Sequence, residues 1–333
     1  MSTINEVAAL ASVSPMTAAR ILAGKSLRSK SRERVLQCAR KLDYVRNQQA
    51  ANLRTGRSRL IGVMVPFIDN PFYTKFLQEM HDALGAQGYQ SLIACSFGES
   101  SSMLAAVSLF ETYHVDGIVL DISEGVVTRE VQKRLQALQR RARSVVVTGT
   151  QQHDIGYDHL YLDNHSAIAK VMRHLLSRSH RELGFIGGFE GNPNIENRLD
   201  GFRHALRKAG LPINPEWISL GNPALGVLPQ RVNRLLRARK RPTAIVCTSD
   251  MIAMVVVKAA YEAGLRVPQD LAVTGFDDIE QASLLNPSLT TVRQPLRAMA
   301  TDIVDLLLRG LGTKRVPIQE KRFEADLVIR EST

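Results

Sequence analysis

One pair of neighbouring carboxyl groups in this sequence could suggest acid–base chemistry: the dipeptide Asp277-Asp278, which lies after the apolar segment 271–275. Adjacent side chains seldom converge on one site, so a single ligand-binding Asp at the carboxyl end of a strand is the better interpretation. The glycine-rich segment 184–191 has neither the G-x-G-x-x-G spacing of a dinucleotide cradle nor the Lys-Ser/Thr pair of a phosphate loop. A G-x-S-x-G nucleophile elbow is also missing. We therefore expect that the protein is not an enzyme.

The histidines and cysteines do not indicate a metal site. The eight histidines include no H-E-x-x-H motif, and we interpret His174 and His180 as surface or core residues. The three cysteines, Cys38, Cys95 and Cys247, form no C-x-x-C pair. Such cysteines are typical of small core residues in a reduced, cytoplasmic protein. We expect no metal and no cofactor.

The amino-terminal residues have the spacing of two short helices that could bind DNA. Thr3 and Glu6 form a T-x-x-E capping box at the start of one helix. Ser14 is positioned to cap a second helix with Pro15 at its first position, and a glycine ends that helix. The short connection predicts a helix-turn-helix, whose second helix enters a DNA major groove with its N-terminus first. A helical hairpin that only packs is the alternative interpretation.

The distribution of charge favours the DNA-binding interpretation. Residues 1–60 contain twelve Lys and Arg against three Asp and Glu, a net charge of +9, whereas the whole chain carries +11. A basic head on a nearly neutral body is the electrostatic pattern of a protein that binds the phosphate backbone.

A third helix and a polar linker follow the hairpin. Ser29 or Ser31 can open a helix that ends near Leu42, and an apolar face along it packs against the hairpin. The polar residues 43–59 read as a linker. Within it, residues 48–54 are long enough for about two helical turns, which are not stable alone in water. This segment is a candidate switch that becomes helical only when something packs on it.

From residue 60 the pattern changes to alternating strands and helices. Continuous apolar runs predict buried strands at 60–66, 90–94, 117–120, 144–148, 183–187, 243–247 and 271–275. Helical stretches separate them, and this alternation predicts parallel sheets with helices on both faces. So many strands indicate two such domains, and residues 163–166 are a plausible crossing point between them.

The chain contains no apolar run that approaches the roughly 20 residues of a membrane span. It begins with a capped helix rather than with the basic and apolar regions of a signal peptide. We expect a cytoplasmic protein with no membrane partner.

Several short stretches together resemble the LacI/GalR family of bacterial transcriptional regulators, from Thr3 to about Ile329. They lie at 3–8, 13–20, 31–35, 42–47, 53–58, 70–73, 116–120, 275–278 and 287–295. The resemblance implies an α/β protein with a three-helix head, a hinge helix and a two-lobed core similar to periplasmic sugar-binding proteins.

The same resemblance predicts the domain boundaries. The head takes residues 1–46, the hinge helix and linker 47–59, and the core 60–333. The N-terminal lobe of the core takes about 60–161 plus 290–321, and the C-terminal lobe takes 162–289 plus 322–333. Family members act as dimers whose two heads bind a near-palindromic operator, so we expect a homodimer.

The resemblance also implies roles for individual residues. Pro15, Met16 and Arg20 would read bases, and Leu53 would wedge into the minor groove, although simple packing of Leu53 against Ala50 is the alternative. The complete set of expected DNA-binding residues is Thr3, Ser14, Pro15, Met16, Thr17, Arg20, Asn47, Ala50, Leu53 and Arg54.

The expected effector-binding residues are Asn70, Phe72, Tyr73, Asp163, Arg198, Ser249, Asp250, Asp277 and Gln294. Arg198 is the strongest candidate, because its planar fork of donors suits hydroxyl or carboxylate oxygens. A surface ion pair with Glu196 or Asp200 is its alternative. Ser249 stands where the family usually has Asn, and Thr148 stands where some members carry an acid. These two differences change which hydroxyl groups of a ligand the site can satisfy.

The sequence therefore predicts a sequence-specific DNA-binding regulator, a repressor, that is controlled by a small sugar or sugar acid bound between the two lobes. A carbohydrate-binding protein without DNA function, as in periplasmic transport, is the alternative. The absence of a signal peptide and the basic head both disfavour it.

Overall fold

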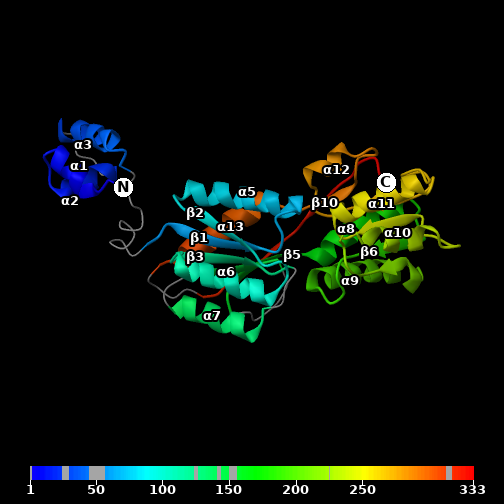
Figure 1. Ribbon diagram of the computed structural model, residues 1–333. Coiled ribbons are helices and arrows are strands. Elements are labelled where there is room, and N and C mark those ends of the chain that lie inside the picture. Colours follow the sequence, from blue (N-terminus) through cyan, green and yellow to red (C-terminus); the bar gives the residue numbers. More distant parts are fainter. Residues whose placement is uncertain are drawn as a thin grey trace. The chain divides into compact units, whose positions relative to one another are not determined.

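The computed structural model describes residues 2–24, 30–44, 57–123, 127–140, 144–149, 156–224, 226–312 and 317–333. It divides into two compact units, Met1–Ser58 and Arg59–Thr333, which are described separately (Figure 1). Four of the expected DNA-binding residues, Asn47, Ala50, Leu53 and Arg54, lie outside the described residues.

The first unit is built on α1 (Ile4–Leu10), α2 (Pro15–Leu22) and α3 (Lys30–Lys41). The predicted capping box is confirmed, since Glu6 N donates to Thr3 Oγ1 at 3.3 Å and Thr3 N donates to Glu6 Oε2 at 2.6 Å. Ser14 caps α2, as predicted, by accepting from Thr17 N at 3.2 Å. The side chains that hold the three helices together are Val7, Ala8, Ala11, Ala18, Ile21, Val35, Cys38 and Ala39.

The second unit begins with a parallel sheet whose strand order is β11-β5-β4-β3-β1-β2 in the described part of the chain. Its strands are β1 (Leu60–Val65), β2 (Gln90–Cys95), β3 (Gly117–Asp121), β4 (Ser144–Thr148), β5 (Asp158–Leu162) and β11 (Glu320–Phe323). We call this sheet and its helices the first lobe. β11 extends to Phe323, beyond the predicted lobe boundary at residue 321.

Helices cover both faces of the first sheet, because successive side chains of a buried strand point to opposite faces. On β1, Ile61 and Val63 pack with α5 (Pro71–Ala86) and α13 (Leu296–Gly310). Met64 points the other way and packs with α6 (Ser100–Thr112) and α7 (Arg129–Arg140). Both faces are therefore apolar, as the continuous apolar run in the sequence predicted.

The second lobe has a smaller parallel sheet with the order β7-β6-β8-β9 among the described residues. Its strands are β6 (Leu183–Ile186), β7 (Ile218–Ser219), β8 (Ala244–Cys247) and β9 (Ala272–Thr274). α8 (Asn164–Ser177) and α9 (Pro193–Lys208) pack on one face. α10 (Leu228–Leu236) and α11 (Asp250–Glu262) pack on the other. A 3-10 turn (Pro215–Trp217) precedes β7, and α12 (Glu280–Leu284) follows β9.

The two lobes are discontinuous in sequence. The chain passes from β5 directly into α8, returns through β10 (Thr291–Arg293) into α13, and passes again from β11 into β12 (Asp326–Val328). β10 and β12 pair antiparallel, with Thr291 opposite Val328, so two of the connecting segments lie side by side (Figure 1). The predicted fold class, an α/β protein with a helical head and a two-lobed core, is confirmed.

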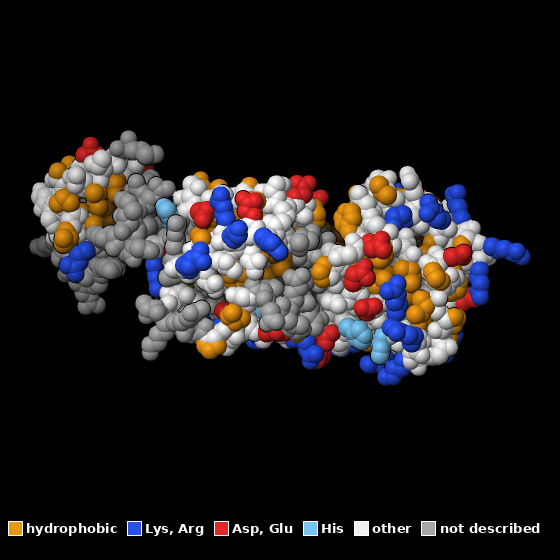
Figure 2. All heavy atoms as spheres, turned by 90° about the horizontal axis from the view of Figure 1, so that it is seen from below, with side chains coloured by type: hydrophobic (Ala, Val, Ile, Leu, Met, Phe, Trp, Pro, Cys, Tyr) orange, Lys and Arg blue, Asp and Glu red, His pale blue; other side chains and the backbone are white. Residues whose placement is uncertain are grey.

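On the face of the core shown in Figure 2, side chains of both charge signs are interspersed. This pattern agrees with a core that carries only a small part of the total charge. No helix in the described ranges is long and apolar enough to cross a membrane.

Candidate functional site

The head exposes one side of α2. Ser14, Pro15 and Arg20 are exposed, and the side chain of Met16 is 68% exposed. Ala18 and Ile21, on the opposite side of the helix, are buried in the core of the head. Pro15 and Met16 at the start of α2 and Arg20 in its last turn therefore lie at the surface of the head. Among the other expected DNA-binding residues, Thr17 is half-buried and bonds Ser14 through its hydroxyl at 2.9 Å, and Thr3 is exposed at the start of α1.

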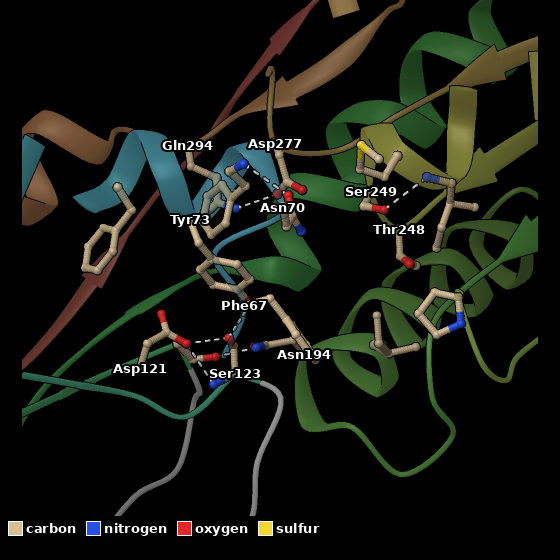
Figure 3. A pocket seen from close by; sticks show the side chains of 18 of the residues that line it. Phe67, Asn70, Tyr73, Asp121, Ser123, Asn194, Thr248, Ser249, Asp277 and Gln294 are labelled. Atoms are coloured by element: carbon tan, nitrogen blue, oxygen red, sulfur yellow. Dashed lines mark hydrogen bonds between the residues drawn. The ribbon is translucent and has the colours of Figure 1, made fainter. Parts of the chain in front are cut away.

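The core contains a cavity of about 680 Å³ between its two lobes (Figure 3). The carboxyl ends of the parallel strands of both sheets point into it, and this edge of an open α/β sheet is where ligands bind. The lining residues that follow or end these strands include Phe67, Asn70, Phe97, Asp121, Ser123, Thr148, Gly149, Gly188, Phe189, Asn222, Thr248, Ser249 and Asp277.

The structure brings seven of the nine expected effector-binding residues together around this cavity. They are Asn70, Phe72, Tyr73, Arg198, Ser249, Asp277 and Gln294. Sequence positions more than 200 residues apart thus meet, because the lobes are discontinuous and the strands of each sheet end at the same edge.

Asp163 and Asp250 do not line the cavity, and the carboxyl groups of both bond other groups of the protein. Asp163 caps α8 by accepting from Ser166 N at 2.9 Å, and it pairs with Arg322 at 3.5 Å. Asp250 is completely buried and accepts from Thr291 Oγ1 and from Ile279 N, the latter at 2.9 Å.

Asp250 has a structural role next to the cavity. Burial raises the pKa of its carboxyl to about 7, and the charge of Asp278 raises the pKa further, against the hydrogen bonds from Thr291 and Ile279. A side chain at Gly275 would collide with this carboxyl, so Gly275 leaves the space that Asp250 occupies. Asp250 therefore joins the start of α11 to Ile279 and Thr291 and does not line the cavity.

Arg198 is held by the protein around it. Its Nε donates to Asn164 Oδ1 at 2.7 Å and its Nη1 donates to the carbonyl oxygen of Thr248. Its guanidinium carbon lies 3.5 Å from the centroid of the Phe276 ring. Glu196 and Asp200, the ion-pair partners of the alternative interpretation, contact Gly191 N and Arg203 instead. The geometry favours a place for Arg198 in the cavity wall.

A chain of hydroxyl and carboxyl groups forms one polar end of the cavity. Tyr73 OH lies 2.8 Å from Ser123 Oγ, and Ser123 donates to Asp121 Oδ1 through its hydroxyl and, at 3.0 Å, through its backbone N–H (Figure 3). Burial raises the pKa of the Asp121 carboxyl to about 6, although the hydrogen bonds from Ser123 lower it. Asp121 and Ser123 were not predicted, and only their position at the end of a buried strand could have indicated them.

The opposite polar end contains Asp277 and Gln294. Gln294 Nε2 donates to Asp277 Oδ1 at 2.9 Å, and Asp277 N donates to Val292 O at 2.8 Å. The backbone of Asp277 has a φ of +115°, in the region that favours glycine. Such strain persists only where the surroundings hold the residue in place, and it is common in ligand sites.

Asn70 and Ser249 each cap a helix that begins at the cavity. Asn70 Oδ1 accepts from Phe72 N at 3.0 Å, and Ser249 Oγ accepts from Ile252 N at 3.3 Å. These caps use the acceptor oxygens of the amide and the hydroxyl, and both groups also carry donor hydrogens.

Two asparagines, also missed by sequence reasoning, join the lobes directly. Asn192 Nδ2 donates to Ser123 O at 2.8 Å, and Asn194 Nδ2 donates to Gly149 O. Asn194 lines the cavity near Ser123, whereas Asn192 caps α9 (Figure 3). The Asn-Pro-Asn sequence at 192–194 predicts a helix start, but it contains no signal for a contact between lobes.

Over the described ranges, no group of three or more His, Cys, Asp or Glu side chains could hold a metal ion.

Two family profiles match this chain. The profile of "Bacterial regulatory proteins, lacI family" matches residues 3–47, and that of "Periplasmic binding protein-like domain" matches residues 172–333. The chain is 28% identical over 333 residues to the HTH-type transcriptional repressor CytR of Escherichia coli (strain K12), covering 100% of this chain and 96% of that protein. It is 29% identical over 337 residues to the ribose operon repressor of Haemophilus influenzae, covering 100% and 98%.

Solved structures are similar over the whole length. The complex of the transcriptional regulator CelR with cellobiose has a TM-score of 0.71 and 26% identity, with 100% of both chains covered. The lac repressor dimer bound to operator and the anti-inducer ONPF has a TM-score of 0.83, with 99% and 98% covered. Because the two sequences are 22% identical, this structural similarity is evidence for the fold alone.

The prediction of a non-enzymatic regulator is confirmed, since the relatives are transcriptional repressors over their full length. The alternative of a carbohydrate-binding protein without DNA function is excluded by the lacI-type head. With this head on a periplasmic-binding-protein-like core, the chain belongs to the LacI family of bacterial regulatory proteins and is a DNA-binding transcriptional regulator.

Proposed function

We propose that this protein is a cytoplasmic, homodimeric repressor whose affinity for a near-palindromic operator is controlled by a sugar bound between the lobes of the core. One observation carries the effector site: polar side chains from both lobes converge on a single cavity at the carboxyl ends of both sheets. A ligand that contacts both lobes stabilises one closure of the core over others.

The DNA-binding role rests on the exposed side of α2. Met16 and Arg20 would contact base edges in the major groove, and the capped N-terminus of α2 would face the phosphate backbone. The hinge residues Leu53 and Arg54 are assigned by family resemblance to the minor groove and to phosphates. A dimer places two such heads on two half-sites, which is why a near-palindromic operator is expected.

The polar residues of the cavity suit a neutral sugar. Asn70, Ser249 and Asp277 offer amide, hydroxyl and carboxylate groups that pair with ligand hydroxyls. A sugar acid would meet Asp277 in the same cavity, whereas two donors of Arg198 already bond Asn164 and Thr248. These charges favour the sugar over the sugar acid. The names of relatives that mention ribose and cellobiose agree with this class.

The coupling between the two sites rests on the connecting segments. Lobe closure moves the first lobe relative to the second about β10, β12 and the β5–α8 connection. The first lobe follows the hinge directly in sequence, so closure in a dimer alters the separation of the two hinge anchor points. A marginal hinge helix then gains or loses its packing partner, and operator affinity changes.

The test begins with selection of a binding site from a random DNA pool by the full chain. Fluorescence anisotropy on that site then measures how each of a panel of sugars and sugar acids changes operator affinity. We expect at least one neutral sugar or sugar derivative to shift it. Residues 59–333 alone should bind that ligand but not the site, because the two functions lie in separate units. A panel without any effect on operator affinity or on the thermal stability of the protein would contradict the proposal.

A further inference from the structure

One short segment of the core concentrates positive charge. Residues 231–241, which run from the middle of α10 into the loop before β8, contain six Lys and Arg and no Asp or Glu. The core as a whole is nearly neutral, because residues 1–60 carry +9 of the total charge of +11. The segment is therefore a local concentration of charge and not a general property of the surface of the core.

Three of these cations lie at the surface without a partner. Arg234, Arg237 and Arg239 are exposed, and none of the hydrogen bonds and ion pairs in the described part of the chain involves their side chains. Lys240 differs, because its ammonium group pairs with Glu182 at 3.0 Å. We call the five residues at the end of this segment the basic end: Arg234, Arg237, Arg239, Lys240 and Arg241.

The loop that carries the basic end is fixed to the second lobe. The buried Trp217 donates from its indole nitrogen to Lys240 O at 3.1 Å, and its ring centroid lies 5.8 Å from Lys240 Nζ. Pro242 packs closely on Gly184, since a Cβ at Gly184 would lie 3.0 Å from the proline ring. The backbone is thus held in place, and a partner would pay only for ordering the arginine side chains.

A polar hollow of about 470 Å³ lies on the same edge of the second sheet. His180 Nδ1 lies 3.1 Å from Thr243 Oγ1, which connects the hollow to the residues just after the basic end. Burial and the charge of Arg178 lower the pKa of His180, so the potential here is positive. The lining offers guanidinium and hydroxyl donors and no carboxyl side chain, since it consists of Ser177, Arg178, Ser179, His180, Pro268 and Thr333.

The basic end lies far from the point where the linker enters the core. The carboxyl ends of the strands of both sheets point into the cavity, whereas residue 59 precedes β1 and the basic end precedes β8. These two positions are therefore at opposite ends of the core. Lys and Arg side chains extend from the end of the second lobe that is farthest from the first lobe (Figure 2).

The kind of cation indicates what the surface binds. A charged face that only serves solubility usually mixes both signs. Here five of the six cations of the segment are Arg. The planar guanidinium group donates two parallel hydrogen bonds to a phosphate or a carboxylate, which the ammonium group of Lys cannot do. The surface is thus complementary to a polyanion.

We propose that the basic end binds the phosphate backbone of a second DNA segment while the heads hold the operator. This inference goes beyond the proposed function, because it requires neither an effector nor lobe closure. DNA is favoured over an acidic protein because the head already brings the chain to DNA. Contacts to phosphates alone have a Kd of about 10⁻⁴–10⁻⁶ M at physiological salt, so this second attachment is weaker than the operator contact and independent of sequence.

The test measures whether the operator-bound protein retains a second duplex. The operator duplex that the full chain selects from a random pool is immobilised on beads and saturated with protein, and unbound protein is washed away. A fluorescent duplex of unrelated sequence is then added at increasing concentration. We expect saturable retention in about 50 mM salt that falls steeply toward about 200 mM, because each phosphate contact contributes about −0.9 to the slope of log K against log salt.

A charge-neutral variant connects this retention to the basic end. Replacement of Arg234, Arg237 and Arg239 by Gln together should weaken retention of the second duplex at least about ten-fold. The salt dependence should also lose about two to three units of slope, since up to three phosphate contacts are removed. Operator affinity should equal that of the wild type, which shows that the variant is folded and that its heads are intact.

The matched control removes the same charge from the first lobe. Arg129, Lys133 and Arg140 are exposed on α7, and their joint replacement by Gln should leave retention within about two-fold of the wild type. Equal retention by the control and by the basic-end variant would overturn the proposal, because binding would then follow total charge or come from the heads.

Two further outcomes also decide against it. A wild-type complex that retains no second duplex in about 50 mM salt has no second DNA surface. Fluorescent poly-L-glutamate serves as the probe for an acidic protein. If the wild type retains this polymer and not the duplex, and the basic-end variant retains neither, the surface binds acidic protein segments and not DNA. The sugar effector is unaffected by every outcome, because no sugar is present.

Discussion

Asn194, in the first turn of α9, donates a hydrogen bond from Nδ2 to the backbone carbonyl oxygen of Gly149 at the end of β4, and so links the second lobe to the first. Asn194 Oδ1 accepts in turn from Asn164 Nδ2 at 3.0 Å, and Asn164 Oδ1 accepts from Arg198. A side chain at Gly149 would collide with Asp121 and Ser123, and its φ is +92°. This short chain of polar contacts connects lobe closure to the cavity wall.

Replacement of Asn194 by alanine should therefore weaken effector binding. The variant loses a hydrogen bond that stabilises the closed core, so we expect effector affinity to fall about two- to ten-fold while operator affinity in the absence of effector changes little. Calorimetric titration and operator anisotropy measure the two affinities. Asn233→Ala is the control, because Asn233 lies on α10 away from the cavity lining. Equal effector affinities for Asn194→Ala and the control would contradict a role of this contact in closure.

Arg198→Ala and Asp277→Ala should bind operator normally and respond to effector only at much higher concentration. Each change leaves a polar group of the ligand unpaired in a closed site, at a cost of roughly 1–3 kcal/mol. Arg198→Lys should rescue little, because an ammonium group cannot bond Asn164 and Thr248 as the planar guanidinium does. Arg203→Ala, on the same helix, is the control. Wild-type effector affinity in Arg198→Ala would remove this residue from the site.

Asp121 should make stability depend on pH. Its pKa is near 4 in the unfolded chain and about 6 in the folded protein, so between these values the folded state holds a proton that the unfolded state has lost. Stability from this group is complete below pH 4 and falls as pH rises through 6, by roughly 3 kcal/mol in all. Urea unfolding at several pH values should show a smaller decline for Asp121→Asn than for the wild type, because Asp250, with a pKa of about 7, contributes a decline of its own. Asp200→Asn changes an exposed carboxyl and should leave the profile unaltered. A decline in Asp121→Asn as large as in the wild type would mean that Asp121 does not contribute.

Arg20→Ala should relax the base preference of the head. A bidentate contact of arginine with guanine contributes about 1–3 kcal/mol to discrimination between bases. Selection from a random DNA pool should return a degenerate base at one position of each half-site for Arg20→Ala, and a milder change for Met16→Ala. Arg40→Ala, in the last turn of α3, is the control for loss of charge alone. The same consensus for Arg20→Ala and the wild type would mean that Arg20 does not read a base.

The sequence alone determined the local structure and the family. A capping box, a proline at a first helical position and short apolar runs act over a few residues. The head helices and the long buried strands were therefore predictable near their observed bounds. The short strands β7, β10, β11 and β12 were not predicted. Three of the four residues of β11 are exposed, so it carries no apolar run, and its place in the sheet depends on pairing with β5.

The tertiary structure decided which polar residues reach the cavity. Ser249 and Asp250 are neighbours in sequence, yet the start of α11 turns the serine toward the cavity and the aspartate toward Thr291 and Ile279. Local signals do not distinguish these two orientations, because the partners of Asp250 lie about 30 and 40 residues away. The same holds for Asn194 and Gly149, because their contact forms only when the edges of two separately built sheets face each other. The free energy cost of closing the loops between these distant residues is offset by the burial of apolar surface across the whole core.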